Sequence, residues 1–523
     1  MAVKRKKGAK PKGSKKTASK RTGRTDAKGV SATGSSSESD LLTMDQAIAL
    51  LKTTRPTFYR WLRSGKLKGT KVGRQWRFYR QDIERFLQGE GPRIALAADI
   101  GPFIAQLRDR LKDLDVRFTP AADLSGLHQA AHLMIRLGQA MRASDIHLAP
   151  HVGEADGQAV VSLRYRVDGV MHPTAELDRR LLAPLIDQWK TLAGCDLNVK
   201  ERPQDGRSML RFEEGGELVD LRLSFLPCAL GESMTARILD RSAVIPELGR
   251  INYAPHDKAK VLKHIEGPWG LIIVTGPVGC GKTTTLYACL QHLASPQIKI
   301  MTVEDPVEFL FPWMVQVQVN EAAGMTFRAA VQSMLRSDPD VILIGELRDH
   351  QVLWIAQASA LTGHLVMSTL HAEEAAKALT RMVDMGSDPF LVTDTTKLVV
   401  AQRLVRELCP HCSALATPEP TLMRRAEEYA RRGGLNWDAI EKGFRQPVGC
   451  AKCGQLGYAG RDVIAEALEV TPEIATALAR GASVEELRTI AVGQGMTTLA
   501  ADGIRRAAEG TTSLDEVVRV LGF

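Results

Sequence analysis

The sequence predicts an α/β protein of several domains, the largest of which is a mainly parallel sheet covered by helices on both faces. The chain has 523 residues, enough for three or four domains. Between residues 250 and 405, helical patterns alternate with apolar strands at 271–275, 299–303, 341–344 and 365–369. No run approaches the roughly 18 consecutive apolar residues of a membrane span, so we expect no transmembrane segment and a cytoplasmic protein.

The net charge of +9 is concentrated at the N-terminus. Residues 1–39 hold 12 Lys and Arg against 2 Asp and Glu, and residues 40–88 hold 11 against 4. The first 88 residues therefore carry +17, and the rest of the chain carries −8. Such a local excess predicts an anionic partner for this end of the chain, either nucleic acid or, less often, an anionic membrane surface.

Residues 1–39 contain almost no large apolar side chain, so we expect a basic disordered tail there, with a purely solubilising tail as the alternative. Residues 40–88 differ. Thr43 and Gln46 form a capping-box signature before an apolar-periodic stretch, and a second helix, a hairpin with a turn at 73–74 and a short helix follow. Helix–turn–helix plus a basic hairpin is the plan of a small winged-helix domain.

The second helix has to bury Phe58, which leaves its basic residues on the solvated face where a recognition helix meets the major groove. The candidate DNA contacts are Arg55, Thr57, Arg60 and Arg63 on this helix and Arg74 and Arg77 on the hairpin. In "TFYRWLRSGKL" and "VGRQWRF" the segment resembles excisionase- and MerR-like winged-helix domains, which implies binding to duplex DNA. An adaptor domain that kept the fold and lost DNA binding is the alternative.

The rest of the chain divides by composition into three parts. Residues 89–121 are predicted to be a linker with one charged helix, and residues 122–245 mix helices and strands. Residues 246–523 hold the alternating strands, a Cys-bearing segment at 405–457 and C-terminal helices.

The segment from Gly276 to Thr283, GPVGCGKT, fits the phosphate-binding pattern G-x-x-x-x-G-K-[ST]. It follows an apolar strand and opens a helix at 284–293, so backbone N–H groups and the helix dipole can face phosphates. Lys282 is expected to reach the β- and γ-phosphates of ATP, and the Thr283 hydroxyl to ligate Mg²⁺. The predicted nucleotide-binding residues are Gly276, Gly279, Gly281, Lys282, Thr283 and Thr284.

Two strand ends carry acids that we expect beside the nucleotide. The strand 341–344 is followed by Gly345 and Glu346; Gly345 occupies the position where such strands usually carry Asp, and Glu346 is placed to polarise the attacking water. We then expect Mg²⁺ to be held through Thr283 and water, with an acid from elsewhere. Another strand ends in a group of acids that begins with Glu304, for which we expect a metal or water role; a solvated strand end is the alternative.

Two histidines, His364 and His371, flank the strand 365–369. Seven residues apart on an extended segment, they lie on opposite sides and are poor co-ligands for one metal. We expect one of them near the γ-phosphate, with His364 as the catalytic candidate and a structural role as the alternative.

Four cysteines form two C-x-x-C pairs, Cys409 with Cys412 and Cys450 with Cys453. Two such turns complete a tetrahedral four-sulfur site that suits Zn²⁺, although the 37 residues between them exceed the commonest spacing. We predict a structural zinc; redox-active pairs are the alternative.

The segments "GPVGCGKTT", "VEDPVE", "RSDPDVILIGELRD", "ALTGHLVMSTLHA" and "QRLVRELCPHC" resemble, in this order, the ATPases of type II secretion and type IV pilus assembly. The resemblance covers roughly residues 125–523. It implies a RecA-like ATPase domain in a homohexameric ring that converts ATP hydrolysis into rotation of an inner-membrane platform protein. It also implies a location at the cytoplasmic side of the inner membrane.

The same resemblance implies that residues 122–245 are a PAS-like α/β domain, on the segments "ASDIH", "RYRVDG" and "PQDGR". Since the nucleotide of that family lies between the two domains, Arg207 and Arg222 are expected nucleotide contacts, with surface ion pairs as the alternative.

A basic tail and a DNA-binding-like module stand where that family usually has another N-terminal domain, which docks on the platform or binds a regulatory nucleotide. Two functions follow. The first is a hexameric ATPase motor of secretion or pilus assembly with a DNA-binding N-terminal domain. The second is a DNA-binding regulator whose ATPase domain is a nucleotide-dependent oligomerisation switch.

Overall fold

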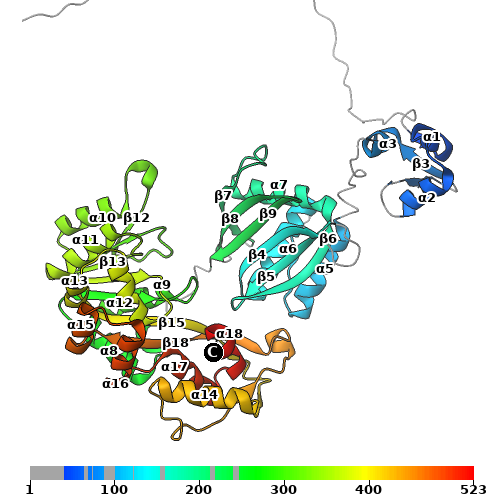
Figure 1. Cartoon of the computed structure of the whole chain (residues 1–523). Helices are drawn as coiled ribbons and strands as arrows, with labels where there is room; N and C mark the ends of the chain where they lie inside the picture. Colours follow the sequence, from blue (N-terminus) through cyan, green and yellow to red (C-terminus); the bar gives the residue numbers. More distant parts are fainter. Residues whose placement is uncertain are drawn as a thin grey trace, which may run out of the picture. The chain divides into compact units, whose positions relative to one another are not determined.

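The computed structural model describes residues 41–63, 67, 69–72, 75–87, 100–121, 123–152, 159–212, 218–239 and 247–522 (Figure 1). The described residues divide into two compact units, one within residues 1–93 and the other within 94–523, and each is described by itself. We call residues 41–87 the N-terminal module, 100–239 the middle domain and 247–522 the C-terminal domain. The predicted tail at 1–39 lies outside the described residues. Within the described ranges, no helix combines the length and the apolar character needed to cross a membrane.

The N-terminal module combines short helices with an antiparallel sheet in the order β1-β3-β2. Its elements are β1 (Leu41–Thr43), α1 (Met44–Leu50), α2 (Arg55–Arg63), β2 (Thr70–Val72), β3 (Gln75–Tyr79) and α3 (Arg80–Leu87). The predicted capping box is confirmed, because Thr43 and Gln46 each accept a hydrogen bond from the other's backbone N–H. Phe58 of α2 is fully buried and packs edge to face on Phe78 of β3, with ring centroids 5.0 Å apart.

The middle domain is an antiparallel sheet in the order β6-β5-β4-β9-β8-β7 with helices packed on one face. Its elements are α5 (Gly101–Asp113), α6 (Gly126–Ala140), β4 (Ala143–Val152), β5 (Ala159–Val167), β6 (Val170–Asp178), η2 (Arg179–Leu181), α7 (Leu182–Ala193), β7 (Gln204–Arg211), β8 (Leu218–Cys228) and β9 (Gly231–Leu239). Side chains such as Leu163, Tyr165 and Phe225 fill the core under the helices. Because side chains alternate along a strand, the residues between them lie on the opposite face of the sheet.

The structure corrects the linker expected at 89–121. Within that range α5 starts at Gly101, and its apolar residues Phe103, Leu107 and Leu111 are buried against α6 in the core of the middle domain. The charged appearance of this helix comes from its solvated face alone, since an amphipathic helix carries its apolar residues in a narrow stripe.

The C-terminal domain is built on a mixed sheet in the order β12-β11-β13-β14-β10-β15-β18, parallel except for the antiparallel pair β15 and β18. Its strands are β10 (Gly270–Thr275), β11 (Ile300–Glu304), β12 (Val315–Gln318), β13 (Val341–Ile344), β14 (Leu365–Leu370), β15 (Thr396–Leu408), β16 (Ala414–Leu415), β17 (Arg445–Gln446) and β18 (Tyr458–Glu469). The strands predicted from the sequence agree with β10, β11, β13 and β14 to within one residue. The mainly parallel sheet is therefore confirmed.

Helices cover both faces of this sheet. They are α8 (Pro255–Ile265), α9 (Lys282–Leu293), α10 (Phe327–Met334), α11 (His350–Leu361), α12 (Ala375–Asp384), α13 (Pro389–Thr395), α14 (Pro420–Arg432), α15 (Pro472–Ala479), α16 (Val484–Gly493), α17 (Leu499–Ala508) and α18 (Leu514–Leu521), with short turns η3 (Leu248–Arg250), η4 (Glu321–Ala323), η5 (Leu335–Ser337) and η6 (Ala451–Cys453). One core joins Ile273 and Ile344 to α10, α11 and α12, and the other joins Ile272 and Leu343 to α8 and α9. Because β10, β11, β13 and β14 run parallel, the segments that follow them meet at one edge of the sheet.

Candidate active site

The phosphate loop connects β10 to α9, in the strand–loop–helix context that the sequence predicts. Helix α9 starts at Lys282, and Gly281 is its N-cap with φ of 90°. Gly276 has φ of 143°, and a Cβ on it would lie 2.5 Å from the carbonyl oxygen of Gln402. A side chain cannot fit there, so Gly276 has a steric role in the loop.

A cleft of about 620 Å³ opens at this loop, a size common among ligand sites. Five of the six predicted nucleotide-binding residues line it, and Gly276 does not; those that do are Gly279, Gly281, Lys282, Thr283 and Thr284. The Lys282 ammonium donates hydrogen bonds to the carbonyls of Gly276 and Pro277 at 2.9 and 3.0 Å. Burial lowers the pKa of Lys282 below its usual value.

Glu346 follows β13 and lines the same cleft. One carboxylate oxygen accepts a hydrogen bond from Arg348 Nε at 3.0 Å, and the other lies 3.1 Å from His371 Nε2. Its hydrogen bond with Glu346 raises the pKa of Arg348. The preceding Gly345 packs closely: a Cβ there would lie 3.2 Å from the carbonyl oxygen of Val303, so the usual Asp of this position would crowd β11.

Glu304, the last residue of β11, also lines the cleft, but its carboxylate is 4% exposed and engaged by neighbours. It accepts hydrogen bonds from the Thr302 hydroxyl at 2.6 Å, from the Tyr287 hydroxyl and, at 3.4 Å, from Gln316 Nε2. Burial raises the pKa of Tyr287, so its hydroxyl remains a donor. These hydrogen bonds hold Glu304 in the wall of the cleft, and they leave its carboxylate less suited to binding a metal directly.

The two histidines lie at opposite ends of β14, as predicted, and the choice of His364 as the catalytic one stays a prediction. His364 precedes β14, and its Nδ1 lies 3.0 Å from the Ser359 carbonyl and 3.1 Å from the Thr362 hydroxyl. His371 follows β14 and lines the cleft. The strand between them is six residues long, or about 20 Å, so only His371 is at the phosphate-loop edge.

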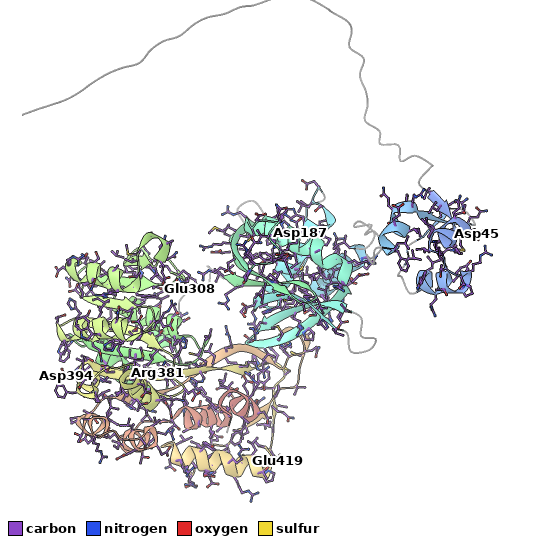
Figure 2. The ribbon with its side chains drawn as sticks, turned by 45° about the horizontal axis from the view of Figure 1, so that its top comes forward. Asp45, Asp187, Glu308, Arg381, Asp394 and Glu419 are labelled. Carbon is purple, nitrogen blue, oxygen red and sulfur yellow. The ribbon has the colours of Figure 1, made fainter. Side chains whose placement is uncertain are left out.

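Acids hold both Arg207 and Arg222, and the role of these two arginines as nucleotide contacts stays a prediction. Arg207 makes a two-pronged ion pair with Asp220, through Nε at 2.8 Å and Nη2 at 2.5 Å. Arg222 lies 3.3 Å from Glu308, which is labelled in Figure 2. Neither arginine lines the phosphate-loop cleft.

A different arginine of the middle domain, Arg237, does line that cleft. Cross-strand register places Arg207, Arg222 and Arg237 in one row over β7, β8 and β9, on the sheet face opposite the helices. In the sequence, Arg237 alternates with apolar residues of β9 in step with Ser233 and Thr235, a period of two that places the three on one face of a strand.

Two further residues of the site carry little sequence signal. Arg348 contacts both Glu346 and, at 3.1 Å, Asp305. In the sequence, only its position two residues after Glu346 indicated that it belongs to the site. Gln402 is 1% exposed and hydrogen-bonds the phosphate loop at Cys280. A polar residue within the apolar run of β15 was the available signal.

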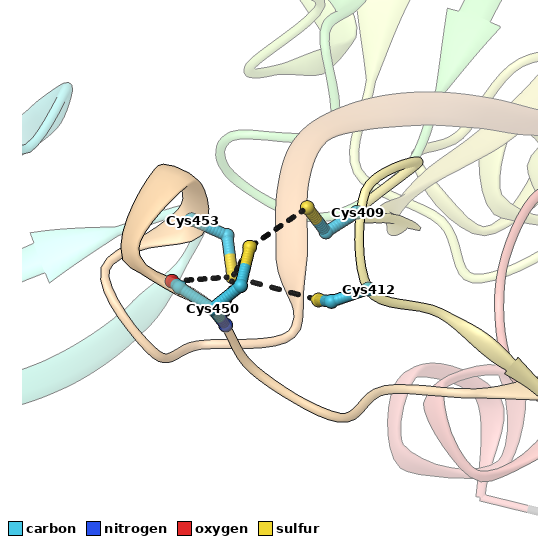
Figure 3. A group of neighbouring side chains, drawn as sticks. All are labelled: Cys409, Cys412, Cys450 and Cys453. Carbon is cyan, nitrogen blue, oxygen red and sulfur yellow. Dashed lines mark hydrogen bonds between the residues drawn. The ribbon is translucent and has the colours of Figure 1, made fainter.

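The four cysteines predicted to bind zinc lie together on two turns (Figure 3). Their sulfurs are all within 4.8 Å of one another, and three of the pairs are 3.8–3.9 Å apart. A tetrahedron with Zn–S bonds of about 2.3 Å places its sulfurs about 3.8 Å apart, so the arrangement fits Zn²⁺. The members of this cluster are Cys409, Cys412, Cys450 and Cys453.

Backbone N–H groups donate hydrogen bonds to two sulfurs of this cluster. Gly449 donates to Cys412 Sγ at 3.3 Å, and Gly457 donates to Cys453 Sγ at 3.2 Å. Burial raises the pKa of Cys453, but hydrogen bonds from the backbone of Cys450 and Gly457 and from neighbouring thiols outweigh it and lower this pKa to about 7.

In the N-terminal module, two of the candidate DNA contacts on α2 lie on its solvated face. Arg55 and Arg60 are exposed, whereas Thr57 is half-buried. Arg55 lies 2.9 Å from Asp45 in an exposed ion pair, which costs little to break. The side chain of Arg63 lies outside the described residues.

On the hairpin of this module, Arg74 also lies outside the described residues. Arg77 of β3 is half-buried and donates to the Gln75 side chain at 2.8 Å. The basic wing is therefore represented in the described part of the chain by Arg77.

Comparison with protein families gives two matches. A model described as type II/IV secretion system protein matches residues 121–519, and a helix-turn-helix domain model matches residues 41–91. The N-terminal helix-turn-helix prediction is confirmed by the second match.

Curated relatives agree with the first match. The type IV pilus assembly ATPase PilB of Thermus thermophilus is 39% identical over 398 residues, which cover 76% of this chain and 43% of that protein. The type II secretion system protein HxcR of Pseudomonas aeruginosa is 42% identical over 386 residues, 73% of this chain and 75% of that one. The type II secretion system protein E of Dickeya dadantii is 37% identical over 445 residues, 85% of each chain.

Solved structures share the fold. The ATPase DotB of Legionella pneumophila aligns with a TM-score of 0.54 and 20% identity over 77% of this chain and 95% of that one. DotB of Yersinia pseudotuberculosis aligns with a TM-score of 0.55 and 18% identity over 78% and 96%. From the matched domain and the 37–42% identity to these relatives, the chain belongs to the family of type II/IV secretion ATPases.

Proposed function

We propose that this protein is an ATP-driven motor of a type II secretion or type IV pilus assembly system, which works as a homohexamer on an inner-membrane platform protein. The observation that carries the proposal is the shared cleft: the phosphate loop, Glu346 and His371 all line it. The names of the relatives supply the secretion and pilus assembly part of the proposal. The proposed place of action is the cytoplasmic side of the inner membrane.

The residues of the cleft have separable roles in hydrolysis. The backbone N–H groups of the phosphate loop and the Lys282 ammonium bind the phosphates of ATP and offset their charge. The Thr283 hydroxyl would be a ligand for the Mg²⁺ that accompanies ATP, an ion that would supply charge neutralisation on the phosphates. Glu346 accepts the proton of the attacking water, and His371, 3.1 Å away, orients its carboxylate.

A steady-state ATPase assay combined with light scattering tests this function. We expect Mg²⁺-dependent hydrolysis and a hexamer in the presence of nucleotide, and we expect Lys282→Ala to abolish nucleotide binding. A chain that stays monomeric in every nucleotide state and hydrolyses no ATP would contradict the motor.

The cysteine cluster is proposed to hold one structural Zn²⁺ per chain. Four thiolates complete a tetrahedral shell and leave no open position for catalysis. Elemental analysis of protein purified without chelator should find one zinc, and Cys450→Ser should lower that content. A zinc-free wild-type protein would contradict this assignment.

The N-terminal module is proposed to bind duplex DNA through α2 and the basic hairpin. We expect the full chain to bind duplex DNA with an affinity that falls steeply with salt, by about 0.9 log units per log unit of salt for each phosphate neutralised. Arg60→Gln should weaken binding more than the matched change Arg80→Gln on α3, where Arg80 pairs with Glu84. A preference for anionic vesicles over DNA at equal ionic strength would instead indicate a membrane tether.

The helix-turn-helix match also favours a second candidate function, a DNA-binding regulator whose ATPase domain is a nucleotide-dependent oligomerisation switch. Duplex DNA distinguishes the two. A regulator should bind a specific sequence more tightly when nucleotide drives oligomerisation, whereas a motor should hydrolyse ATP equally fast with or without DNA.

A further inference from the structure

The phosphate loop is held from behind by Gln402, a residue of β15 that does not line the cleft. Its side-chain Nε2 donates a hydrogen bond to the carbonyl of Cys280 at 2.8 Å. Its Oε1 accepts hydrogen bonds from the Tyr253 hydroxyl at 2.7 Å and from the Thr285 hydroxyl at 3.1 Å. Because a carbonyl can only accept, the amide has one orientation that satisfies all three partners.

These contacts lie in a dry environment. Gln402 is 1% exposed, and Tyr253 and Thr285 are 4% exposed. A polar group that loses its partner in such a place costs the free energy of its desolvation, so the network resists rearrangement. The amide of Gln402 is therefore a fixed point against which the loop rests.

The position of the Cys280 carbonyl decides where the next N–H points. The Cys280 carbonyl and the Gly281 N–H belong to one planar trans peptide unit, in which they point in opposite directions. Since Gln402 holds the carbonyl toward β15, the N–H of Gly281 points away from β15. Gly281 lines the cleft beside Lys282 and Thr283, where a phosphate loop uses such N–H groups.

Close packing leaves the loop little freedom to turn over. A Cβ on Gly276 would lie 2.5 Å from the Gln402 carbonyl oxygen, and a Cβ on Gly281 would lie 3.2 Å from Gln402 Nε2. Both ends of the loop therefore rest on the same residue of β15.

We propose that Gln402 is a positioning residue for nucleotide binding: it fixes the Cys280–Gly281 peptide so that the Gly281 N–H faces the phosphates. The proposal rests on the ATP binding and hydrolysis assigned to the same cleft. Gln402 touches neither the nucleotide nor the reacting water.

Two variants separate positioning from stability. Gln402→Glu keeps an acceptor for Tyr253 and Thr285 but places a carboxylate oxygen against the Cys280 carbonyl, which repels it. Gln402→Met keeps the shape of the side chain and removes the donor. We expect the KM for MgATP and the Kd for MgADP to rise about 30-fold in Gln402→Glu and about tenfold in Gln402→Met, the effect of one lost buried hydrogen bond. The kcat at saturating ATP should stay within about threefold, because the lost interaction binds ground state and transition state alike.

A matched control is Gln357→Met on α11. Gln357 is 0% exposed and accepts a hydrogen bond from the Ser387 hydroxyl at 2.8 Å, but it lies away from the cleft. This variant should lower the melting temperature and leave KM and Kd unchanged. Tyr253→Phe, which keeps the donor to Cys280, should raise KM less than Gln402→Met does.

The outcomes are distinct. If Gln402→Met and Gln402→Glu only lower the melting temperature, as Gln357→Met does, with KM and Kd unchanged, the positioning role is wrong. If Gln402→Glu does not fold, Gln402→Met decides the question by the same measurements. A wild-type chain that binds MgADP but hydrolyses no ATP would overturn the proposed function, and the Kd series would still test the role of Gln402.

Discussion

The carboxyl edge of the C-terminal sheet and the open face of the middle-domain sheet both gather charged side chains, but they hold them differently. At the edge, Glu346 contacts Arg348 and His371, and all three line the cleft. On the open face, Arg207 is paired with Asp220, and Arg222 with Glu308. Arg237 of the same row is also paired, with Asp145 at 3.0 Å, yet it lines the phosphate-loop cleft, so pairing with an acid and facing that cleft are separate properties of these arginines.

The largest effect is expected from a substitution at the carboxyl edge of the C-terminal sheet. Glu346→Gln should retain MgATP binding, since the amide has the size of the carboxylate, and should slow turnover by about 10²–10⁴-fold because the base is lost. The matched change Glu321→Gln, in η4 and exposed, should have no effect. Steady-state rates and nucleotide affinity measure both. Wild-type turnover in Glu346→Gln would remove Glu346 from the mechanism.

Substitutions of the two histidines test which end of β14 lies at the site of ATP hydrolysis. His371→Ala should slow turnover by about tenfold, the value of one hydrogen bond to a charged group. His364→Ala, at the other end of β14, should stay within about twofold of the wild type under the same assay. The reverse order would support His364 as the functional histidine and contradict the role proposed for His371.

The arginine row predicts a smaller and graded effect. Arg237 lines the cleft, so Arg237→Gln should raise the KM for ATP by about threefold, as expected for a partly exposed charge. Arg207→Gln and Arg222→Gln should each change KM by less than about twofold while their acids hold them in place. A larger effect of Arg222→Gln than of Arg237→Gln would mean that nucleotide draws Arg222 away from Glu308.

Two buried acids of the C-terminal domain differ in their hydrogen-bond partners, and this difference makes the stability of the domain depend on pH. Glu304 has hydrogen-bond donors around it, whereas Asp257 of α8, 1% exposed, has no hydrogen bond to either carboxylate oxygen in the described part of the chain. Burial raises the pKa of Asp257 to about 7, above its usual value near 3.8. The folded chain therefore keeps this proton while the unfolded chain loses it, and stability falls as pH rises from about 4 to about 7.

Asp257→Asn should remove that loss. We expect the variant to melt a few degrees above the wild type at pH 8, about 1–2 kcal/mol, and close to it at pH 4. Asp394→Asn, an exposed position in the same domain, is the control. Equal melting curves of Asp257→Asn and wild type at pH 8 would show that the buried carboxyl carries no penalty.

The sequence by itself determined the local parts of this protein. The phosphate loop, the capping box and the C-x-x-C turns each use residues within eight positions of one another, so backbone geometry alone brings their side chains together. The strands β10, β11, β13 and β14 were also predictable from the sequence, because a short apolar run bounded by turn residues is typical of a buried strand. Parallel strand direction also placed Glu346 beside the loop.

Only the tertiary structure decided which partners the charged and polar side chains have and which side chains line the cleft. The partner of Arg222 is 86 residues away and that of Gln402 at the loop is 122 away, and no local pattern encodes such pairings. The same holds for α5. Its apolar residues pack against α6 in the core of the middle domain, although the composition of this segment suggested a linker. Local motifs follow from chain connectivity, whereas these contacts follow from the packing of whole elements, which minimises unsatisfied charge and exposed apolar surface over the entire domain.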